Sequence, residues 1–285
     1  MLMQRLAEGI DRTGNPSVIG LDTKTGYLPQ GVTEVAEFNR GIMDALCGAV
    51  AAVKIQIAMY EERGLRGMAD FFDAAEYAKE KGFIVIADVK RGDIGDTAAS
   101  YSKAYLSKDC IDFVTLNPYL GYDSLQPFFE DCGRYDKGAF VLVKTSNKGC
   151  ADIQNLMTEG RPLYEAVAQK VTAWGKGYMD GEYSRIGGVA GATYPGELRR
   201  IRSIMKECFL LIPGYGAQGG TAGDIAAALD GNERGILINS SRKVLLAYRK
   251  SGRDYRDAAR DEVLRMREEI SDAFANSRKD RQDLI

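Results

Sequence analysis

Eight short apolar runs, rich in β-branched residues, recur along the chain. Continuous apolar runs of this length are typical of strands that are buried on both faces, as in parallel sheets. The segments between them carry apolar residues at helical spacing instead. The eight runs are residues 18–22, 52–58, 83–90, 113–117, 140–145, 186–193, 209–214 and 235–239. This alternation predicts a chain of βα units.

Several of the intervening segments also carry signals for helix ends. Residues 34–50 place Val35, Phe38 and Ile42 on one face, and residues 64–82 end at Gly82, a favoured residue just past a helix. Two more segments begin at Pro162 and Pro195, because proline suits the first helical position. Eight such units at a spacing of about 30 residues favour a (β/α)8 TIM barrel of the α/β class. A doubly wound open sheet has the same local pattern and is the alternative.

The two ends of the chain read as helices added to one domain, which we expect to span residues 1–285. Residues 1–17 have charges among apolar positions, as in an amphipathic helix and unlike a signal peptide. Residues 250–285 form a charged C-terminal helical extension. Its apolar residues, Val263, Leu264, Met266, Ile270 and Phe274, should pack on the barrel wall. An interaction tail is the alternative.

Composition narrows the function. The net charge is −2 with mixed signs, which argues against nucleic acid as a partner, and no apolar run is long enough to cross a membrane. The five cysteines form no CxxC pair, so we expect reduced thiols and a cytoplasmic protein. The chain has no histidine, which excludes Ser-His-Asp and Cys-His nucleophiles and every His-ligated metal site.

The third apolar run ends in charged residues. Because side chains alternate along a strand, Asp88 and Lys90 should point to the same face, into the barrel mouth where active sites of this fold lie. Asp88 would then keep Lys90 protonated against desolvation, and Asp93 follows in the next loop. A structural ion pair is the alternative. Arg91 and Asp96 should be loop or helix-start charges, with Asp96 capping a helix that begins near Thr97.

The last two runs indicate a phosphate site. Residues 214–219 match GxGxxG, and Arg242 lies in the segment after the next run. A dinucleotide site would need further βα units downstream, where only a helical tail remains. In TIM barrels the loops after strands seven and eight commonly bind phosphate through backbone amides, and an arginine can add a bidentate contact. A merely structural turn stays open as a third interpretation.

Together these motifs resemble a known family. The stretch IADVKRGDIGDT is similar to the D-x-K-x-x-D-I-x-x-T signature of the orotidine 5′-phosphate decarboxylase family, and VKTSNKG, IPGYGAQGG and INSSR extend the match. The likeness is to the longer bacterial subgroup and covers nearly the whole chain to about residue 248. Gln56, Met59 and Lys148 stand where that subgroup suggests Asn, Phe and Pro, and Ser241 stands where shorter members have Gly.

The resemblance implies conversion of orotidine 5′-monophosphate to uridine 5′-monophosphate and CO2, the last step of pyrimidine synthesis, without metal or cofactor. Lys90 would protonate C6 of the pyrimidine and Asp88 would sit beside the substrate carboxylate. Asp93, with Ile94 and Thr97, would enter from the partner subunit of a homodimer. The other implied substrate-binding residues are Asp22 and Lys54 at the ribose, Ser146 at the pyrimidine edge, Gln218 between base and phosphate, and Pro213, Ser241 and Arg242, the last at the phosphate.

Two rival functions remain at this point. A sugar-phosphate decarboxylase or aldolase of the same superfamily would use the same carboxylates with Mg²⁺. A catalytically silent nucleotide-binding barrel would keep Gln218 and Arg242 but would not need Asp88, Lys90 and Asp93. Loops at residues 147–160 and near Gln218 are the candidates for closing over substrate.

Overall fold

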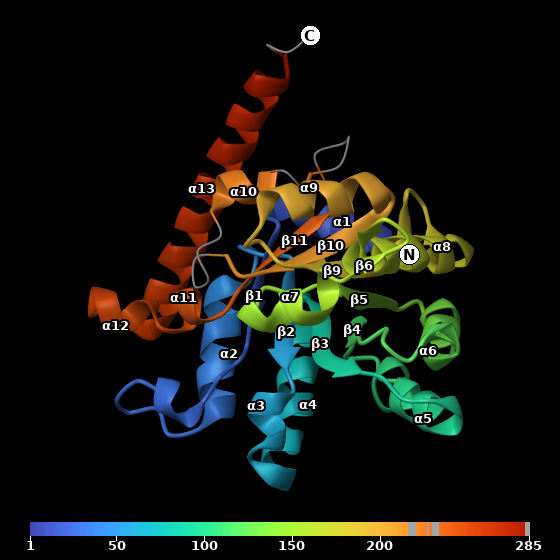
Figure 1. Cartoon of the computed structure of the whole chain (residues 1–285). Helices are drawn as coiled ribbons and strands as arrows, with labels where there is room; N and C mark the ends of the chain where they lie inside the picture. The colour runs from blue at the N-terminus through green and yellow to red at the C-terminus, as the bar shows by residue number, and fades with distance from the viewer. Residues whose placement is uncertain (216–220, 227, 230–233, 283–285) are drawn as a thin grey trace.

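Eight parallel strands close into a barrel (Figure 1). The computed structural model describes residues 1–215, 221–226, 228–229 and 234–282. The strand order is β10-β11-β1-β2-β3-β4-β5-β9, and pairing of β9 with β10 closes the ring. These strands are β1 Ser17–Gly20, β2 Ala52–Gln56, β3 Ile84–Arg91, β4 Phe113–Leu116, β5 Gly138–Lys144, β9 Tyr183–Ala190, β10 Cys208–Pro213 and β11 Ile236–Ser240. The TIM barrel is confirmed, and the closing pair excludes the open sheet.

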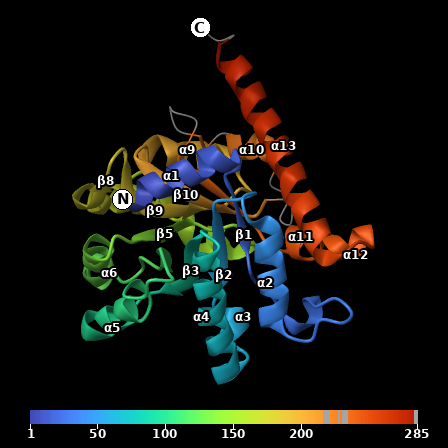
Figure 2. The ribbon, with the colours of Figure 1, turned by 180° about the vertical axis from the view of Figure 1, so that it is seen from behind.

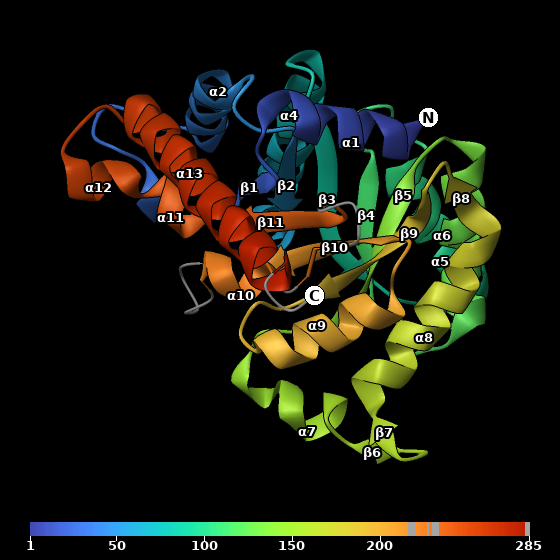
Figure 3. The same cartoon turned by 90° about the horizontal axis from the view of Figure 1, so that it is seen from above.

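Helices surround this barrel (Figure 3). They are α1 Leu2–Thr13, α2 Val35–Leu46, α3 Ala58–Glu61, α4 Gly64–Glu80, α5 Gly95–Leu106, α6 Tyr122–Arg134, α7 Ala151–Gln154, α8 Leu163–Gly175, α9 Pro195–Ile204, α10 Ala222–Ala226, α11 Arg242–Leu245, α12 Ala247–Ser251 and α13 Tyr255–Gln282. Pro195 opens α9 as predicted, and Gly82 follows α4 with a φ of 84°. Pro162 is the N-cap of α8 and precedes its first turn by one residue.

The long segment between β5 and β9 contains more regular secondary structure than its polar sequence suggests. It holds α7 and a small antiparallel hairpin of β6 (Met157–Thr158) and β7 (Arg161–Pro162) before α8. A further short strand, β8 (Met179–Asp180), pairs with the start of β9. The segment between β5 and β9 therefore contains regular secondary structure of its own.

Strand β3 shows how alternation sorts its residues into two cores. Ile84 and Ile86 point into the barrel, where they join a cluster that includes Phe113 and Phe140. Val85, Ala87 and Val89 belong to the outer core between strands and helices. Because the inward positions are the even ones, Asp88 continues the inward series at the point where the strand reaches the mouth.

The N-terminal helix α1 closes the bottom of the barrel (Figure 2). Leu2, Met3 and Leu6 are buried in the same cluster as the inward-facing strand residues. Burial of each such side chain contributes roughly 1.5–3 kcal/mol. The amphipathic helix expected from residues 1–17 is confirmed, and because it seals the opposite end, the open mouth lies at the C-terminal ends of the strands.

The C-terminal helix α13 docks along the outside, against α2, α10 and α11. Val263, Met266 and Ile270 are buried and Phe274 packs partly against them, as predicted, while Leu264 is half-buried. At its start, Tyr255 stacks on Phe38 with ring centroids 5.0 Å apart. None of the described helices is both long and apolar enough to span a membrane.

Candidate active site

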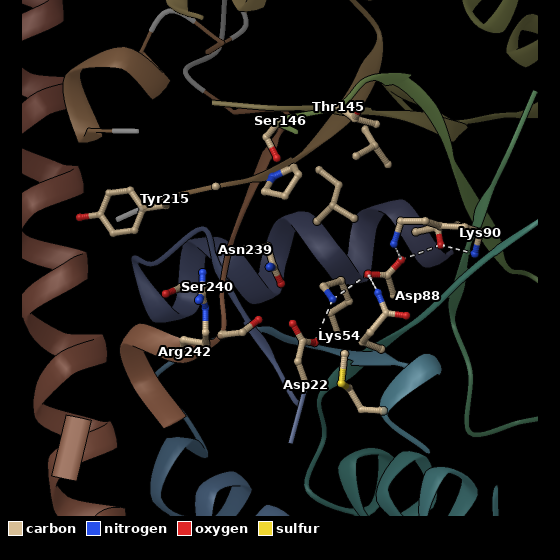
Figure 4. Close-up of a pocket in the computed structure, with 18 of the residues that line it drawn as sticks. Asp22, Lys54, Asp88, Lys90, Thr145, Ser146, Tyr215, Asn239, Ser240 and Arg242 are labelled. Carbon is tan, nitrogen blue, oxygen red and sulfur yellow. Dashed lines mark hydrogen bonds and ion pairs between the residues drawn. The ribbon is translucent and has the colours of Figure 1, made fainter. Parts of the chain in front are cut away.

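A cavity of about 640 Å³ opens at the C-terminal ends of the barrel strands (Figure 4). Eight of the residues singled out in the sequence line it, from six different strands or the loops that follow them. They are Asp22, Lys54, Asp88, Lys90, Ser146, Pro213, Ser241 and Arg242. The fold thus brings together residues that are up to 220 positions apart (242 − 22).

Asp88 is the centre of the charged side of this cavity. Its Oδ1 accepts hydrogen bonds from Lys90 Nζ at 2.6 Å and Thr115 Oγ1 at 2.9 Å. Its Oδ2 accepts from Lys54 Nζ at 2.8 Å and Gln56 Nε2 at 3.0 Å. The side chain is only 8% exposed. Four donors on one buried carboxylate leave it no freedom to turn, so its charge is held in a fixed place.

The ionisation of this cluster follows from its contacts. Burial alone would raise the pKa of Asp88, but Lys54 and Lys90 outweigh it and hold that pKa far below the usual range. Burial would likewise lower the pKa of Lys54, yet the carboxylates of Asp22 and Asp88 raise it above its ordinary value. Lys54 Nζ lies 3.2 Å from Asp22 Oδ1. Asp88 and Lys54 are therefore both charged near neutral pH.

Lys90 reaches Asp88 by a route that simple alternation does not describe. The β3–β4 register shifts between Ala87 and Arg91, and Lys90 has a φ of 44°. The backbone N–H of Lys90 donates to Thr115 Oγ1 at 2.9 Å, which stabilises this left-handed conformation. The predicted Asp88–Lys90 ion pair is confirmed, but it forms through a β-bulge and not through regular strand alternation. The Lys90 side chain is 45% exposed in the single chain, so the desolvation that we expected there falls on Lys54 instead.

The opposite side of the cavity is formed by the end of β11. Asn239, Ser240, Ser241 and Arg242 line it in sequence. Asn239 Oδ1, Ser240 Oγ and Ser241 Oγ are buried and have no hydrogen-bond partner among the described residues. Buried polar atoms of this kind are normally satisfied, so the three oxygens and the Arg242 guanidinium form a surface suited to a polar ligand.

The turn that carries Ser146 packs closely against the neighbouring strand. A Cβ added at Gly191 would come within 2.9 Å of Ser146 Cβ, so only glycine permits this approach. Beside it, the Thr145 backbone N–H donates to Gln154 Oε1 at 2.9 Å. Ser146 is thereby held on the cavity wall by β9 and by α7.

Asp22 is positioned by a buried network behind it. Thr23 Oγ1 donates to Asn39 Oδ1 at 2.6 Å, and Asn39 Nδ2 donates to Tyr60 Oη at 2.9 Å. The Tyr60 hydroxyl in turn donates to the Leu21 carbonyl at 3.1 Å. Both neighbours of Asp22 are therefore fixed, which directs its carboxylate toward Lys54.

Three of the predicted residues lie outside the cavity of their own chain. Asp93, Ile94 and Thr97 sit on the loop after β3 and the start of α5, and none of them lines the pocket. The cap predicted for Asp96 is wrong: α5 begins at Gly95 with Ile94 as N-cap, so Asp96 lies inside the first turn. The loop position predicted for Arg91 is also wrong: Arg91 is the last residue of β3, half-buried, and pairs with Glu61 at 2.6 Å without lining the cavity.

The sequence interpretation missed Thr115 and Gln56 as parts of the site, and it gave no role to the side chain of Tyr215 within the 214–219 motif. Thr115 is the one polar residue in the short strand β4, and that was its only signal. Gln56 is two residues beyond Lys54, on the same face of β2. Gln218 lies outside the described residues. No cluster of three or more potential Cys, Asp or Glu metal ligands occurs in the described part of the chain.

Comparison with known proteins matches the part of the chain that carries the motifs described above. A model of the orotidine 5′-phosphate decarboxylase / HUMPS family matches residues 18–255, which is most of the chain. The chain belongs to this family. A protein from Clostridium kluyveri named orotidine 5′-phosphate decarboxylase is 42% identical over 284 residues, covering 95% of this chain and 97% of the relative. One of that name from Clostridium tetani is 40% identical over 287 residues, covering 96% of this chain and 99% of the relative.

Solved structures agree with the barrel. That of a putative orotidine 5′-phosphate decarboxylase from Streptomyces avermitilis has a TM-score of 0.82 at 33% identity and covers 96% of both chains. That of Leishmania donovani OMP decarboxylase has a TM-score of 0.77 at 32% identity, covering 93% of this chain and 98% of that one. The resemblance seen in the sequence motifs is thereby confirmed as family membership.

Proposed function

We propose that this chain decarboxylates orotidine 5′-monophosphate to uridine 5′-monophosphate and CO2, with Lys90 delivering the proton to C6 of the pyrimidine. The main support for this reaction is sequence similarity. The family model and relatives that are more than 40% identical along nearly the full length are named for this activity. The chain is on that ground a carboxy-lyase of pyrimidine biosynthesis. The role of Lys90 rests on its ammonium at the cavity wall, 2.6 Å from a buried carboxylate.

The chemistry needs a fixed cation beside the reacting carbon. Loss of CO2 leaves electron density at C6 that the ring delocalises poorly. An ammonium fixed next to C6 stabilises that localised charge more than it stabilises the dispersed carboxylate, so it lowers the barrier. Lys90 then acts as general acid, its proton moving to C6. Asp88 holds the ammonium in place, and its own charge faces the departing carboxylate.

The remaining cavity residues supply binding contacts in this proposal. Asp22 and Lys54, already paired, would meet the ribose hydroxyls, and Ser146 the edge of the pyrimidine. Ser241 and Arg242 would hold the phosphate, where the side-chain oxygens at the end of β11 lack partners among the described residues. Pro213 lines the wall between base and phosphate. Binding energy from the phosphate can then be used at the distant reacting carbon.

We infer further that the active enzyme is a homodimer in which Asp93, Ile94 and Thr97 serve the partner's cavity. These residues flank the site without lining their own pocket. Exposed apolar side chains occur in this segment and in the loop after β4: Ile94 is 60% exposed, and Tyr119 and Leu120 are 82% and 46% exposed. Exposed apolar residues gathered at a site rim are typical of a subunit interface. The five free thiols suit the cytosol, where we expect the enzyme to act.

Mixing two inactive variants tests the shared site. Lys90→Ala and Asp93→Ala homodimers should each be nearly inactive. Random mixing in equal amounts makes about half of the dimers heterodimers, and each heterodimer has one intact site out of two. About a quarter of wild-type activity should therefore return on mixing. No recovery, with heterodimers shown to be present, would contradict the shared site.

The reaction itself is tested by following the absorbance of orotidine 5′-monophosphate in EDTA. Turnover should persist under chelation. If EDTA abolishes it and Mg²⁺ restores it, the metal-dependent sugar-phosphate chemistry of the rival branch is favoured, since that chemistry needs a divalent cation on the carboxylates.

A further inference from the structure

The C-terminal helix α13 presents a polar face toward the phosphate end of the cavity. Its residues Glu262, Arg265 and Glu269 are three and four positions apart, so they share one side of the helix. The family model ends at residue 255, where α13 begins. The helix is therefore an addition to the part of the chain that the family model describes.

That polar face contacts the loop after β10 and the start of α11. The Tyr215 hydroxyl donates a short hydrogen bond to Glu269 Oε2. Lys243 Nζ lies 3.4 Å from Glu269 Oε2 and 3.2 Å from Glu262 Oε1, and 4.8 Å from the centroid of the Tyr215 ring. Burial and the neighbouring carboxylate raise the pKa of Tyr215, so its hydroxyl is the donor. In Figure 4 this hydroxyl points away from the cavity, toward the outer helix.

Both contacted residues adjoin the proposed phosphate-binding groups. Tyr215 is 4% exposed, lines the cavity, and follows Gly214, whose φ of 103° only glycine readily adopts. Lys243 comes directly after Arg242 in the first turn of α11. One carboxylate on α13 thus contacts one residue from each of the two segments that would surround the phosphate.

We propose that Glu269 is a positioning residue for phosphate binding, which acts through Tyr215 and Lys243 to set the spacing between Tyr215 and Arg242. The proposal rests on the phosphate role assigned to Arg242 above. Its physical effect is preorganisation: residues that are already held in their binding positions lose less entropy when the ligand arrives. The helix itself does not need these polar contacts to dock, because Val263, Met266 and Ile270 are buried beneath it.

The ion pair between Glu269 and Lys243 is also too exposed to matter much for stability. Glu269 is 43% and Lys243 24% exposed, and ion pairs at such positions contribute little to folding free energy. A positioning role and a purely structural role therefore predict different results. The first changes ligand affinity at nearly constant stability, whereas the second changes stability at constant affinity.

The test measures uridine 5′-monophosphate affinity by calorimetry for Tyr215→Phe, Glu269→Ala and both together, with Tm recorded for each. Glu268→Ala is the matched control, since Glu268 is the exposed glutamate next to it on the same helix. Each single variant should weaken Kd roughly two- to ten-fold, the effect of one hydrogen bond, with Tm near wild type. The double variant should bind no worse than Glu269→Ala alone, because Glu269→Ala already removes the contact that Tyr215→Phe breaks.

Unchanged Kd for Glu269→Ala, or a Kd loss equal to that of Glu268→Ala, overturns the inference. Arg242→Ala separates it from the proposed function. If Arg242→Ala weakens Kd and Glu269→Ala does not, only the role of Glu269 is lost. If Arg242→Ala also leaves Kd unchanged, the phosphate assignment falls and the positioning role falls with it.

Discussion

The two sides of the cavity differ in how their polar groups are satisfied. On one side, Asp88 accepts four hydrogen bonds from side chains of the protein itself. On the other, three side-chain oxygens at the end of β11 have no partner among the described residues. The difference matches two tasks. A reacting group must be held in one geometry before substrate arrives, whereas a binding surface must keep its hydrogen-bonding capacity for the ligand.

Removing the reacting cation should have the largest effect. In the proposed mechanism Lys90→Ala takes away the general acid and the charge beside C6, so kcat should fall by at least about 10³-fold. Affinity for uridine 5′-monophosphate should change little, because the groups on the binding side remain. Lys103→Ala, an exposed lysine on α5, is the control. Steady-state assays measure kcat and calorimetry measures affinity. An active Lys90→Ala enzyme would contradict the division of the cavity into a reacting side and a binding side.

The second-largest effect should be a loss of stability when the central carboxylate, Asp88, is neutralised. Asp88→Asn leaves Lys54 buried with only Asp22, and breaking a buried pair costs about 3–5 kcal/mol. Because the folded pKa of Asp88 is depressed, its contribution is present above the unfolded value of about 4 and is lost as pH falls through the folded value. Urea unfolding of both proteins should show a constant difference from pH 5 to 8 that shrinks in acid. A difference that grows in acid would contradict this assignment.

On the binding side, Arg242→Gln should weaken uridine 5′-monophosphate by about 10- to 100-fold, the range for a hydrogen bond to a charged group. Stability should stay near wild type, since the side chain is exposed. The affinity of the variant should depend less on salt than that of wild type, because one charge–charge contact is gone. Titrations at two ionic strengths test this, and an unaltered salt dependence would place the phosphate elsewhere.

The smallest effect is expected at Thr115. Thr115→Val keeps the shape but removes one of four donors to Asp88 and the acceptor for the Lys90 backbone N–H. The free energy of unfolding should fall by about 1–2 kcal/mol. Since the same change loosens the bulge that aims Lys90, kcat should fall more than affinity. Equal losses in kcat and affinity would show that the two sides are not separable.

Much of the fold followed from periodicity. All eight strands fall at or near the predicted runs, because a parallel strand buried on both faces must be apolar throughout. The cap assigned to Asp96 failed because Ile94 and Gly95 already start the helix, and propensity alone places helix ends only to within a residue or two. Thr115 was overlooked because one threonine in an apolar strand is ordinary on its own.

The sequence by itself determined the barrel, the family and the identity of the charged residues at the mouth, since each depends on local pattern or motif. Tertiary structure decided how those charges meet. Lys54, not Lys90, takes the buried position between two carboxylates, and a bulge against Thr115 turns Lys90 back toward Asp88. Only the folded chain also brings Glu269 beside Tyr215. Such contacts join residues far apart in the chain, and no local pattern records which distant side chains share a space.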